Sequence, residues 1–273
     1  MQLETIFGTA RPVIAMLHVP GLPGRPRHDV AGGLDRLVDV LGRDLAVLEE
    51  AGVDGVLFCN ENDIPYQLEV GPEIPAAMAG AIGQLRRDIH IPFGVNILWD
   101  AIASLALARA TGARFIREVL TGVYESDLGM IQPRIGEIAG YRTRIGAGDV
   151  ALFDNISPEF ASAIGGRSIA DRARGAAFLG MDALLVSGPA AGVQFRMDDL
   201  RAARDAVGGS VPVIANTGVR AERVPEIFAV ADGCIVGTSL KRDGVTWNAV
   251  DPDRANRLMD AVRAFRSHVG AGA

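Results

Sequence analysis

The stretch VPVIANTGVRAERVPEIFAVADGCIVGTS, residues 211–239, contains one complete strand–helix–strand unit. Two apolar runs, 211–217 and 233–239, each end in a cluster of Asn, Thr, Ser or Gly, as strands buried on both faces of a parallel sheet do. The segment between them, about 222–230, has the apolar spacing of an amphipathic helix. The unit predicts an α/β protein with a parallel sheet.

The same alternation extends towards both ends of the chain. Six further strand-like runs precede the unit, at 13–19, 54–60, 92–99, 114–120, 150–156 and 182–188. Helical patterns lie at about 34–50, 73–88, 101–111, 168–179, 198–207 and 253–267. Gly52 is placed to cap the end of the first helix, and Asp251-Pro252 to begin the last one.

Eight strand–helix units in 273 residues average about 34 residues each, which is the length expected for a (β/α)₈ TIM barrel. No linker, low-complexity tract or block of charge interrupts the pattern, so we predict a single barrel domain over residues 1–273. A doubly wound sheet is the alternative architecture. The loop after its first strand would normally carry GxGxxG, whereas PGLPG stands at 20–24.

Composition excludes several classes of protein. The chain has 27 Lys and Arg against 33 Asp and Glu, a net charge of −6, which argues against a nucleic-acid surface. Cys59 and Cys234 are too far apart for a zinc ribbon, a ferredoxin cluster or a disulfide scaffold. We find neither the pattern of a signal peptide nor 18 consecutive apolar residues. We therefore expect a cytoplasmic protein without an integral membrane segment. We also expect it to bind a small phosphorylated molecule and to form a homo-oligomer.

Polar residues collect at the carboxyl ends of the strands, where TIM barrels build their active sites. The candidate catalytic residues are His18, Glu61, Asp63, Glu118 and Asp154. The candidate substrate-binding residues are Asn96, Asp100, Arg117, Asn155 and Asn216. Adjacent residues of a strand face opposite sides, so only one of Arg117 and Glu118 should face the lumen. For each Asp or Asn the structural alternative is that it caps the next helix or binds a loop.

The loops after the last two strands have the layout of a phosphate site. Glycines let backbone N–H groups approach an anion, and neighbouring hydroxyls add donors. We assign phosphate binding to Ser187, Gly188, Gly218, Gly237 and Thr238. Ser239, Lys241 and Arg220 are placed to add a hydroxyl and positive charge. The alternative is that these glycines only permit tight turns.

The sequence predicts no organic cofactor, because it contains no nucleotide-binding fingerprint. A divalent cation is left open, since Glu61, Asp63, Glu118 and Asp154 offer oxygen ligands. Lys241 is the only lysine and follows the eighth strand, which argues against a lyase that works through a lysine Schiff base.

Several motifs together resemble the BtpA/SgcQ family of ribulose-phosphate-binding TIM barrels. They are MLHVPGLPGRP (16–26), NENDIPY (60–66), GVNIL (94–98), TGARFIR (111–117) and ADGCIVGTSLK (231–241), followed by Trp247-Asn248 and Val250-Asp251-Pro252. The chain departs from the family in three places. Leu98-Trp99-Asp100 replaces an Arg-Asn-Asp-like run, Glu118-Val119 replaces Val-Asn, and Asp154-Asn155 replaces a Lys-His pair. Relative to the family, the strand ends have gained carboxylates and lost basic groups.

The resemblance implies a barrel whose relatives include a thylakoid-associated factor for photosystem I biogenesis and nucleosidase-like enzymes. Our leading hypothesis is an isomerase or epimerase that acts on a phosphorylated sugar or related phosphate ester. Glu118 and Asp154 would exchange the protons, with His18 as the alternative shuttle. One alternative is hydrolysis of a nucleoside, in which a carboxylate stabilises an oxocarbenium-like centre. The other is a non-enzymatic assembly factor for a membrane complex, which would need an exposed apolar or basic patch.

Overall fold

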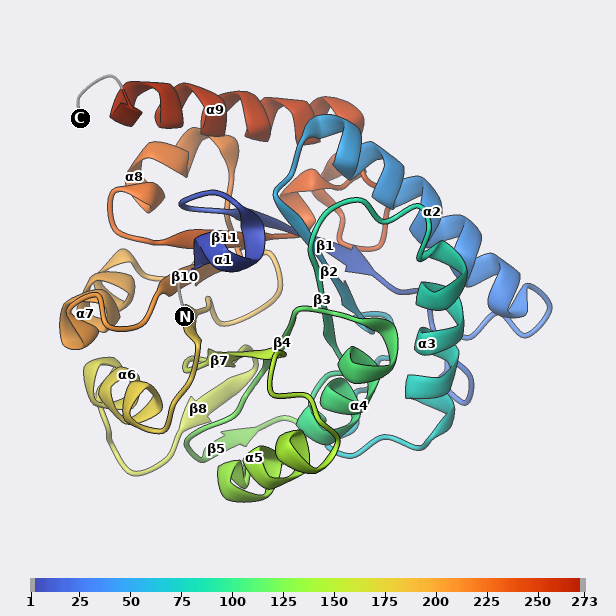
Figure 1. Cartoon of the computed structure of the whole chain (residues 1–273), viewed down its shortest axis with the longest axis horizontal. Coiled ribbons are helices and arrows are strands. Elements are labelled where there is room, and N and C mark those ends of the chain that lie inside the picture. Colours follow the sequence, from blue (N-terminus) through green and yellow to red (C-terminus); the bar gives the residue numbers. More distant parts are fainter. Residues whose placement is uncertain (1–2, 271–273) are drawn as a thin grey trace.

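The computed structural model describes residues 3–270, and eight parallel strands in it close into a barrel (Figure 1). The barrel closes where β1 pairs with β11, Val13 lying opposite Cys234. In order around it the strands are β1 (Val13–His18), β2 (Gly55–Cys59), β3 (Phe93–Asn96), β4 (Phe115–Glu118), β7 (Ala151–Asn155), β9 (Ala183–Val186), β10 (Val213–Asn216) and β11 (Gly233–Val236). The predicted TIM barrel is confirmed, and all eight predicted runs contain a barrel strand.

Alternation along each strand divides the apolar side chains between two cores. In β4, Phe115 belongs to the lumen cluster, together with Phe153 of β7 and Ile14 of β1. Ile116, the next residue, belongs to the larger cluster between the strands and the helices. Every residue of the eight barrel strands is buried, which is why these runs are apolar on both faces. The face of a strand therefore decides whether a polar residue at its end reaches the lumen.

Helices alternate with the strands and surround the barrel. They are α2 (Gly33–Ala51), α3 (Glu73–Leu85), α4 (Ala101–Thr111), α5 (Ile135–Arg144), α6 (Ile169–Phe178), α7 (Met197–Val207), α8 (Val224–Phe228) and α9 (Pro252–Gly270). Gly52 caps α2 in the left-handed region at φ 84°, as predicted. Asp251 accepts hydrogen bonds from the backbone N–H groups of Asp253 and Arg254 and so caps α9. The predicted helix at 222–230 is shorter and begins with a 3₁₀ turn, Ala221–Arg223.

The short helix α1 (Leu3–Phe7) covers the amino-terminal end of the barrel, near the centre of Figure 1. Its apolar residues belong to the lumen cluster. The rings of Phe7 and Phe115 pack edge to face, with their centroids 5.6 Å apart. A Cβ atom on Gly55 would lie only 2.6 Å from the Phe7 ring, so this contact requires glycine. With that end filled, access to the lumen comes from the carboxyl ends of the strands.

A small antiparallel sheet and helix α5 were not predicted from the sequence. The sheet consists of β5 (Tyr124–Ser126), β6 (Gly129–Ile131) and β8 (Ala161–Ala163). These strands belong to the long loops that follow β4 and β7, and they are too short to show an alternating pattern. In α5 only Ile138 is buried, so the helix lacks a clear apolar face. The sheet holds the loop after β7 in place, which matters for the site described next.

Candidate functional site

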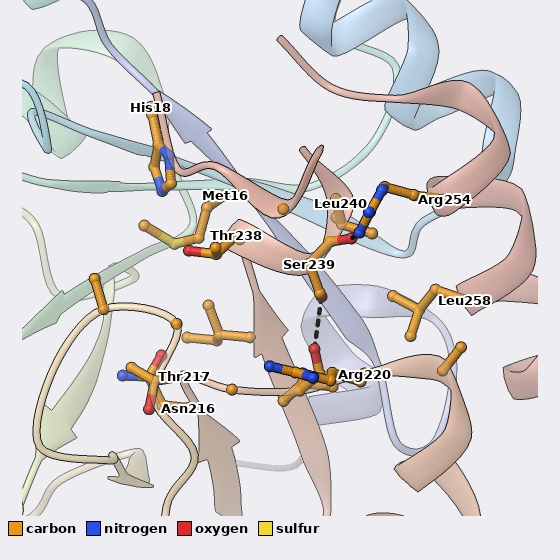
Figure 2. Close-up of a pocket in the computed structure, with 18 of the residues that line it drawn as sticks. Met16, His18, Asn216, Thr217, Arg220, Thr238, Ser239, Leu240, Arg254 and Leu258 are labelled. Atoms are coloured by element: carbon orange, nitrogen blue, oxygen red, sulfur yellow. Dashed lines mark hydrogen bonds between the residues drawn. The ribbon is translucent and has the colours of Figure 1, made fainter. Parts of the chain in front are cut away.

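A cavity of about 410 Å³ opens at the carboxyl ends of the strands, a volume in the range of small-molecule sites. We call its two parts the lumen end and the mouth. The lumen end is lined by Met16, His18, Glu61, Arg117, Glu159 and Asn216. The mouth is lined by Gly218, Arg220, Gly237, Thr238, Ser239, Arg254 and Arg257, together with two acids, Glu222 and Asp243. Figure 2 shows the loop after β10 and the loop after β11 facing each other across the cavity.

Arg117 lies at the centre of the lumen end. Its Nη2 donates to Glu159 Oε1 at 2.8 Å, and its Nη1 donates to Asn96 Oδ1 at 3.0 Å. Glu118 fixes the orientation of the Asn96 amide, because Asn96 Nδ2 donates to Glu118 Oε1 at 2.6 Å. The Nε of Arg117 is buried and has no hydrogen-bond partner within residues 3–270. An oxygen atom of a ligand that reached this nitrogen would satisfy it.

Glu159 is the second centre of this network. Besides the ion pair with Arg117, its Oε2 accepts from Asn155 Nδ2 at 2.8 Å and its Oε1 from Asn216 Nδ2 at 3.1 Å. Ser187 completes the ring, since its hydroxyl donates to Asn155 and accepts from Asn216. The predicted substrate-binding residues Asn155 and Asn216 thus hold Glu159. Only Asn216 of the two lines the cavity.

Glu61 is the carboxyl group of the lumen end that is best placed for proton transfer. It lines the cavity, and the single Tyr66 hydroxyl proton is shared between the Glu61 carbonyl oxygen at 3.0 Å and Oε1 at 3.2 Å. The Cys59 thiol lies 3.6 Å from Oε2. Burial raises the pKa of Glu61, although Arg117 acts in the opposite direction. A carboxyl group with a raised pKa exchanges protons more readily near neutral pH.

His18 presents an unprotonated ring nitrogen towards the cavity. Burial, together with the positive charge of Lys241, lowers the pKa of His18 to about 3, so the ring is neutral. Nδ1 lies 3.2 Å from the carbonyl oxygen of Thr246, which fixes the proton on Nδ1. Nε2 is then an acceptor. A Cβ atom on Gly237 would lie 3.2 Å from it, so glycine at 237 keeps this nitrogen accessible.

The mouth combines positive charge with backbone donors. Arg220 follows β10, Arg254 lies in the first turn of α9, and Figure 2 shows both near Ser239. The Ser239 hydroxyl already donates to the carbonyl oxygen of Val219 at 2.6 Å, so it is not a free donor. Gly237 precedes the 3₁₀ turn of Thr238–Leu240. The first N–H groups of such a turn have no acceptor within it, so they are available to an anion.

Three of the four non-glycine residues with positive φ in the described chain lie in loops around the cavity. They are Phe160 at φ 58°, Thr217 at 65° and Asp243 at 58°. Phe160 directly follows Glu159, and Thr217 directly follows Asn216. Left-handed backbone of this kind costs of order 1–3 kcal/mol per residue and persists where the surroundings enforce it. Its position next to Glu159 and Asn216 supports a functional role for these loops.

The two carboxylates predicted as the catalytic pair lie outside the cavity. Glu118 and Asp154 are neighbours in the β4–β7 register, on the strand face turned towards the helices. Glu118 accepts from the Ser104 hydroxyl of α4 at 2.6 Å. Asp154 accepts from the backbone of Leu120 and the hydroxyl of Thr121. Burial raises the pKa of Glu118 to about 8 and that of Asp154 to about 6. Both carboxyl groups therefore bind other parts of the chain next to the strands.

Three other predicted site residues also bind parts of the chain. Asp63 accepts from the backbone N–H of Leu22 at 2.9 Å and ties the first loop to the second. Asp100 caps α4. The N–H of Gly188 donates to Thr217 Oγ1 at 2.7 Å, so it is not free for a phosphate.

Lys241, which the sequence suggested as a source of charge for the phosphate, is buried in an ion pair. Its Nζ lies 2.7 Å from Asp44 Oδ2, and Lys241 is not among the residues that line the cavity. The positive charge at the mouth comes from arginines instead. This also separates the only lysine from the reacting end.

The four acids that were considered as a cation site are not gathered together. Glu61 faces the cavity, Asp63 faces the first loop, and Glu118 and Asp154 face the helices. Within residues 3–270, no three His, Cys, Asp or Glu side chains are grouped so that they would hold a metal ion. In the same range, no helix has the length and apolar character needed to cross a membrane.

Glu159, Arg254 and Arg257 line the cavity and were not singled out in the sequence. Glu159 lies four residues beyond Asn155, in a loop whose direction the sequence does not reveal. The arginines had a usable signal, because the Asp251-Pro252 cap fixes where α9 begins. Residues 254 and 257 are then one turn apart at the amino-terminal end of that helix, on one face.

Comparison with known proteins agrees with the motifs. A model of the BtpA family matches residues 9–264. The sgc region protein SgcQ of Escherichia coli (strain K12) is 46% identical over 265 residues, which cover 97% of this chain and 98% of SgcQ. The photosystem I biogenesis protein BtpA of Synechocystis sp. is 32% identical over 266 residues, 96% of this chain and 91% of that protein.

Solved structures add agreement on the fold alone. The native KDPGal structure matches this barrel with a TM-score of 0.60 at 15% identity, over 98% of this chain and 100% of that one. The family resemblance stated from the motifs is confirmed by the family model and by SgcQ, each of which spans most of the chain. The chain belongs to the BtpA family.

Proposed function

We propose that this protein is an enzyme that acts on a phosphorylated sugar or a related phosphate ester, by proton transfer of the isomerase or epimerase type. The observation that carries the proposal is that one cavity has two chemically different ends. The mouth offers arginines and backbone donors, and the lumen end offers carboxylates and an unprotonated histidine nitrogen. A phosphate bound at the mouth would position the rest of the substrate over the lumen end.

The mouth suits a phosphate monoester. Around this opening three arginines, Arg220, Arg254 and Arg257, outnumber two acids, Glu222 and Asp243. Guanidinium groups bind phosphate oxygens through paired donors. Gly237 and the start of the Thr238–Leu240 turn add backbone N–H groups. Of the five residues predicted to bind phosphate, Gly218, Gly237 and Thr238 line the cavity, and they remain part of the proposal.

The lumen end suits proton transfer next to a carbonyl group. Glu61 would remove the proton from the hydroxyl-bearing carbon beside the carbonyl and return it to the former carbonyl carbon, while the proton of that hydroxyl passes to the former carbonyl oxygen, so that the carbonyl and hydroxyl groups exchange places. The unpaired Nε of Arg117 would bind the oxygen that becomes negative in the intermediate. His18 Nε2 would accept a hydrogen bond from a substrate hydroxyl. Glu61 therefore takes the proton-transfer role that the sequence had suggested for Glu118 and Asp154, and His18 orients a substrate hydroxyl.

Phosphate binding provides the first test. Titration calorimetry with inorganic phosphate should show binding to the wild type, and Arg254→Met should weaken it roughly 10- to 100-fold, the value of one charged hydrogen bond. Arg134→Met is the matched control, because Arg134 is an exposed arginine on the outer side, before α5. Equal affinities in the wild type and Arg254→Met would contradict the assignment of the mouth.

A thermal-shift panel then separates the functional alternatives. A ligand that binds only the folded state stabilises it by about 2.7 kcal/mol at 100 times its Kd. Sugar phosphates are expected to raise the Tm, and unphosphorylated nucleosides are not. The reverse result would favour the nucleosidase alternative. The assembly-factor alternative would be favoured by two results together. Sugar phosphates would raise the Tm without being converted, and the protein would bind to vesicles.

A further inference from the structure

We infer that the lumen end selects an uncharged, hydroxyl-rich group and rejects a carboxylate, and that Glu159 is the residue that determines this specificity. The inference rests on the proposed function, in which the mouth holds the phosphate. It narrows the substrate class to phosphate esters whose reacting end is a polyol, aldehyde or ketone. Phosphorylated sugar acids are excluded.

The first argument is that the positive charge of Arg117 is already committed. A ligand carboxylate is bound best by a guanidinium that offers two parallel donors. Here Nη1 is bonded to Asn96 and Nη2 is bonded to Glu159, at 3.0 and 2.8 Å. Nε has no partner in the part of the chain that the structure describes. The guanidinium therefore keeps N–H donors for a ligand oxygen, but its charge is already neutralised by Glu159, so a ligand carboxylate would have to share this one cation with a fixed carboxylate.

The second argument is the balance of charge and of hydrogen-bonding groups. The charged side chains that line the lumen end are Glu61, Arg117 and Glu159, one cation and two acids. His18 Nε2 adds an acceptor with no charge. The acids therefore outnumber the cation at this end. Hydroxyl groups can donate to these acids, whereas an additional carboxylate would have to share Arg117 with Glu61 and Glu159.

The third argument is that Glu159 is held firmly in its position. Three donors from three strands fix it: Arg117 of β4, Asn155 of β7 and Asn216 of β10. Phe160, in the left-handed region at φ 58°, is anchored by the hydrogen bond from its N–H to the carbonyl oxygen of Pro189. A carboxylate held this way does not move aside for a second anion. It can therefore discriminate between ligands by charge.

The test compares two ligands that differ only at the end remote from phosphate. Glucitol 6-phosphate ends in a hydroxymethyl group, and gluconate 6-phosphate ends in a carboxylate. Titration calorimetry of the wild type is expected to show that glucitol 6-phosphate binds roughly 10- to 100-fold more tightly than gluconate 6-phosphate. This ratio corresponds to the loss of affinity caused by one unsatisfied charged group. Gluconate 6-phosphate that binds as tightly as glucitol 6-phosphate, or more tightly, would overturn the inference and leave the phosphate site intact.

The role of Glu159 is tested by the ratio of these two affinities. Glu159→Gln removes the charge and keeps the shape, so the ratio should fall at least about tenfold, chiefly through tighter binding of gluconate 6-phosphate. Glu137→Gln removes one charge from an exposed site on α5 and should keep the wild-type ratio. An unchanged ratio in Glu159→Gln would remove Glu159 from this role. If inorganic phosphate and both esters fail to bind the wild type, the proposed function falls, and the inference falls with it.

Discussion

Replacing Glu61 by Gln is expected to lower turnover roughly 10²- to 10⁴-fold, the usual contribution of a general base. Gln keeps the volume of the side chain and an oxygen that can accept from Tyr66, whose hydroxyl lies 3.2 Å from Oε1. It cannot take up a proton from a substrate carbon. The measurement is incorporation of solvent deuterium into a sugar phosphate selected in the thermal-shift panel, followed by NMR.

Two controls make this result specific. Inorganic phosphate should bind Glu61→Gln as it binds the wild type, because the arginines of the mouth are unchanged. Glu137→Gln, the same chemical change on the exposed surface of α5, should exchange deuterium at the wild-type rate. Exchange by Glu61→Gln within about threefold of the wild type would exclude Glu61 as the base and leave the phosphate site standing, since a general base contributes at least about 10²-fold.

The pH dependence provides a second readout for Glu61. A base must be ionised to accept a proton, so kcat/KM should rise with pH through the pKa of Glu61. Burial raises that pKa above its ordinary value of 4.5, so the rise should lie at higher pH than for an exposed Glu. His18 does not contribute to the profile near neutral pH, because its pKa is lowered to about 3. The rise should be absent in Glu61→Gln.

The barrel was predictable because its signal is repeated. Each strand is buried on both faces, so each is a compact apolar run, and eight such runs occur at regular spacing. The small sheet of β5, β6 and β8 gives no such signal, because three-residue strands cannot show a period. Helix α5 was missed for a related reason, since Ile138 is its only buried residue.

The sequence predicts that the site lies at the carboxyl ends of the strands. It does not predict which face of each strand a given side chain occupies. In β4 the two-residue period places Arg117 and Glu118 on opposite sides, but it does not say which one faces inward. The register decides: Arg117 lies opposite Phe153, and Phe153 is in the lumen. Asp154 and Asn155 then follow, with Asp154 turned outward and Asn155 inward. Register between strands depends on the closed barrel, which no single segment encodes.

Glu159 could not be identified by the same reasoning, because it belongs to no strand. It reaches Arg117 through a loop that Pro189 and the small sheet hold in place, and these contacts join residues far apart in sequence. Gly188 and Gly218 show a related limit. Their tight packing against the chain at Val193 and Gln194 explains why glycine stands there. The structural alternative for glycine therefore holds at Gly188, while Gly218 also lines the cavity.

Replacing Glu118 by Gln is expected to stabilise the fold increasingly as the pH rises. Burial raises the pKa of Glu118 from 4.5 to about 8. Below pH 4.5 the carboxyl group is protonated in the folded and unfolded chains alike. Between these two pKa values the unfolded chain releases the proton and the folded chain keeps it, so stability falls as the pH rises. A difference of 8 − 4.5 units corresponds to a loss on the order of 5 kcal/mol, at about 1.4 kcal/mol per unit.

Gln is never charged, so it removes this loss while its oxygen can still accept from Asn96 and Ser104. The free energy of unfolding, measured with urea at pH 5, 6, 7 and 8, should be similar for the two proteins at pH 5 and higher for Glu118→Gln at pH 8. Some decline should remain in the variant, because the pKa of Asp154 is also raised, to about 6. Glu137→Gln should follow the wild type, since Glu137 is exposed. Parallel curves for Glu118→Gln and the wild type would mean that Glu118 is ionised in the folded protein. In that case its contacts with Asn96 and Ser104 would be those of a carboxylate.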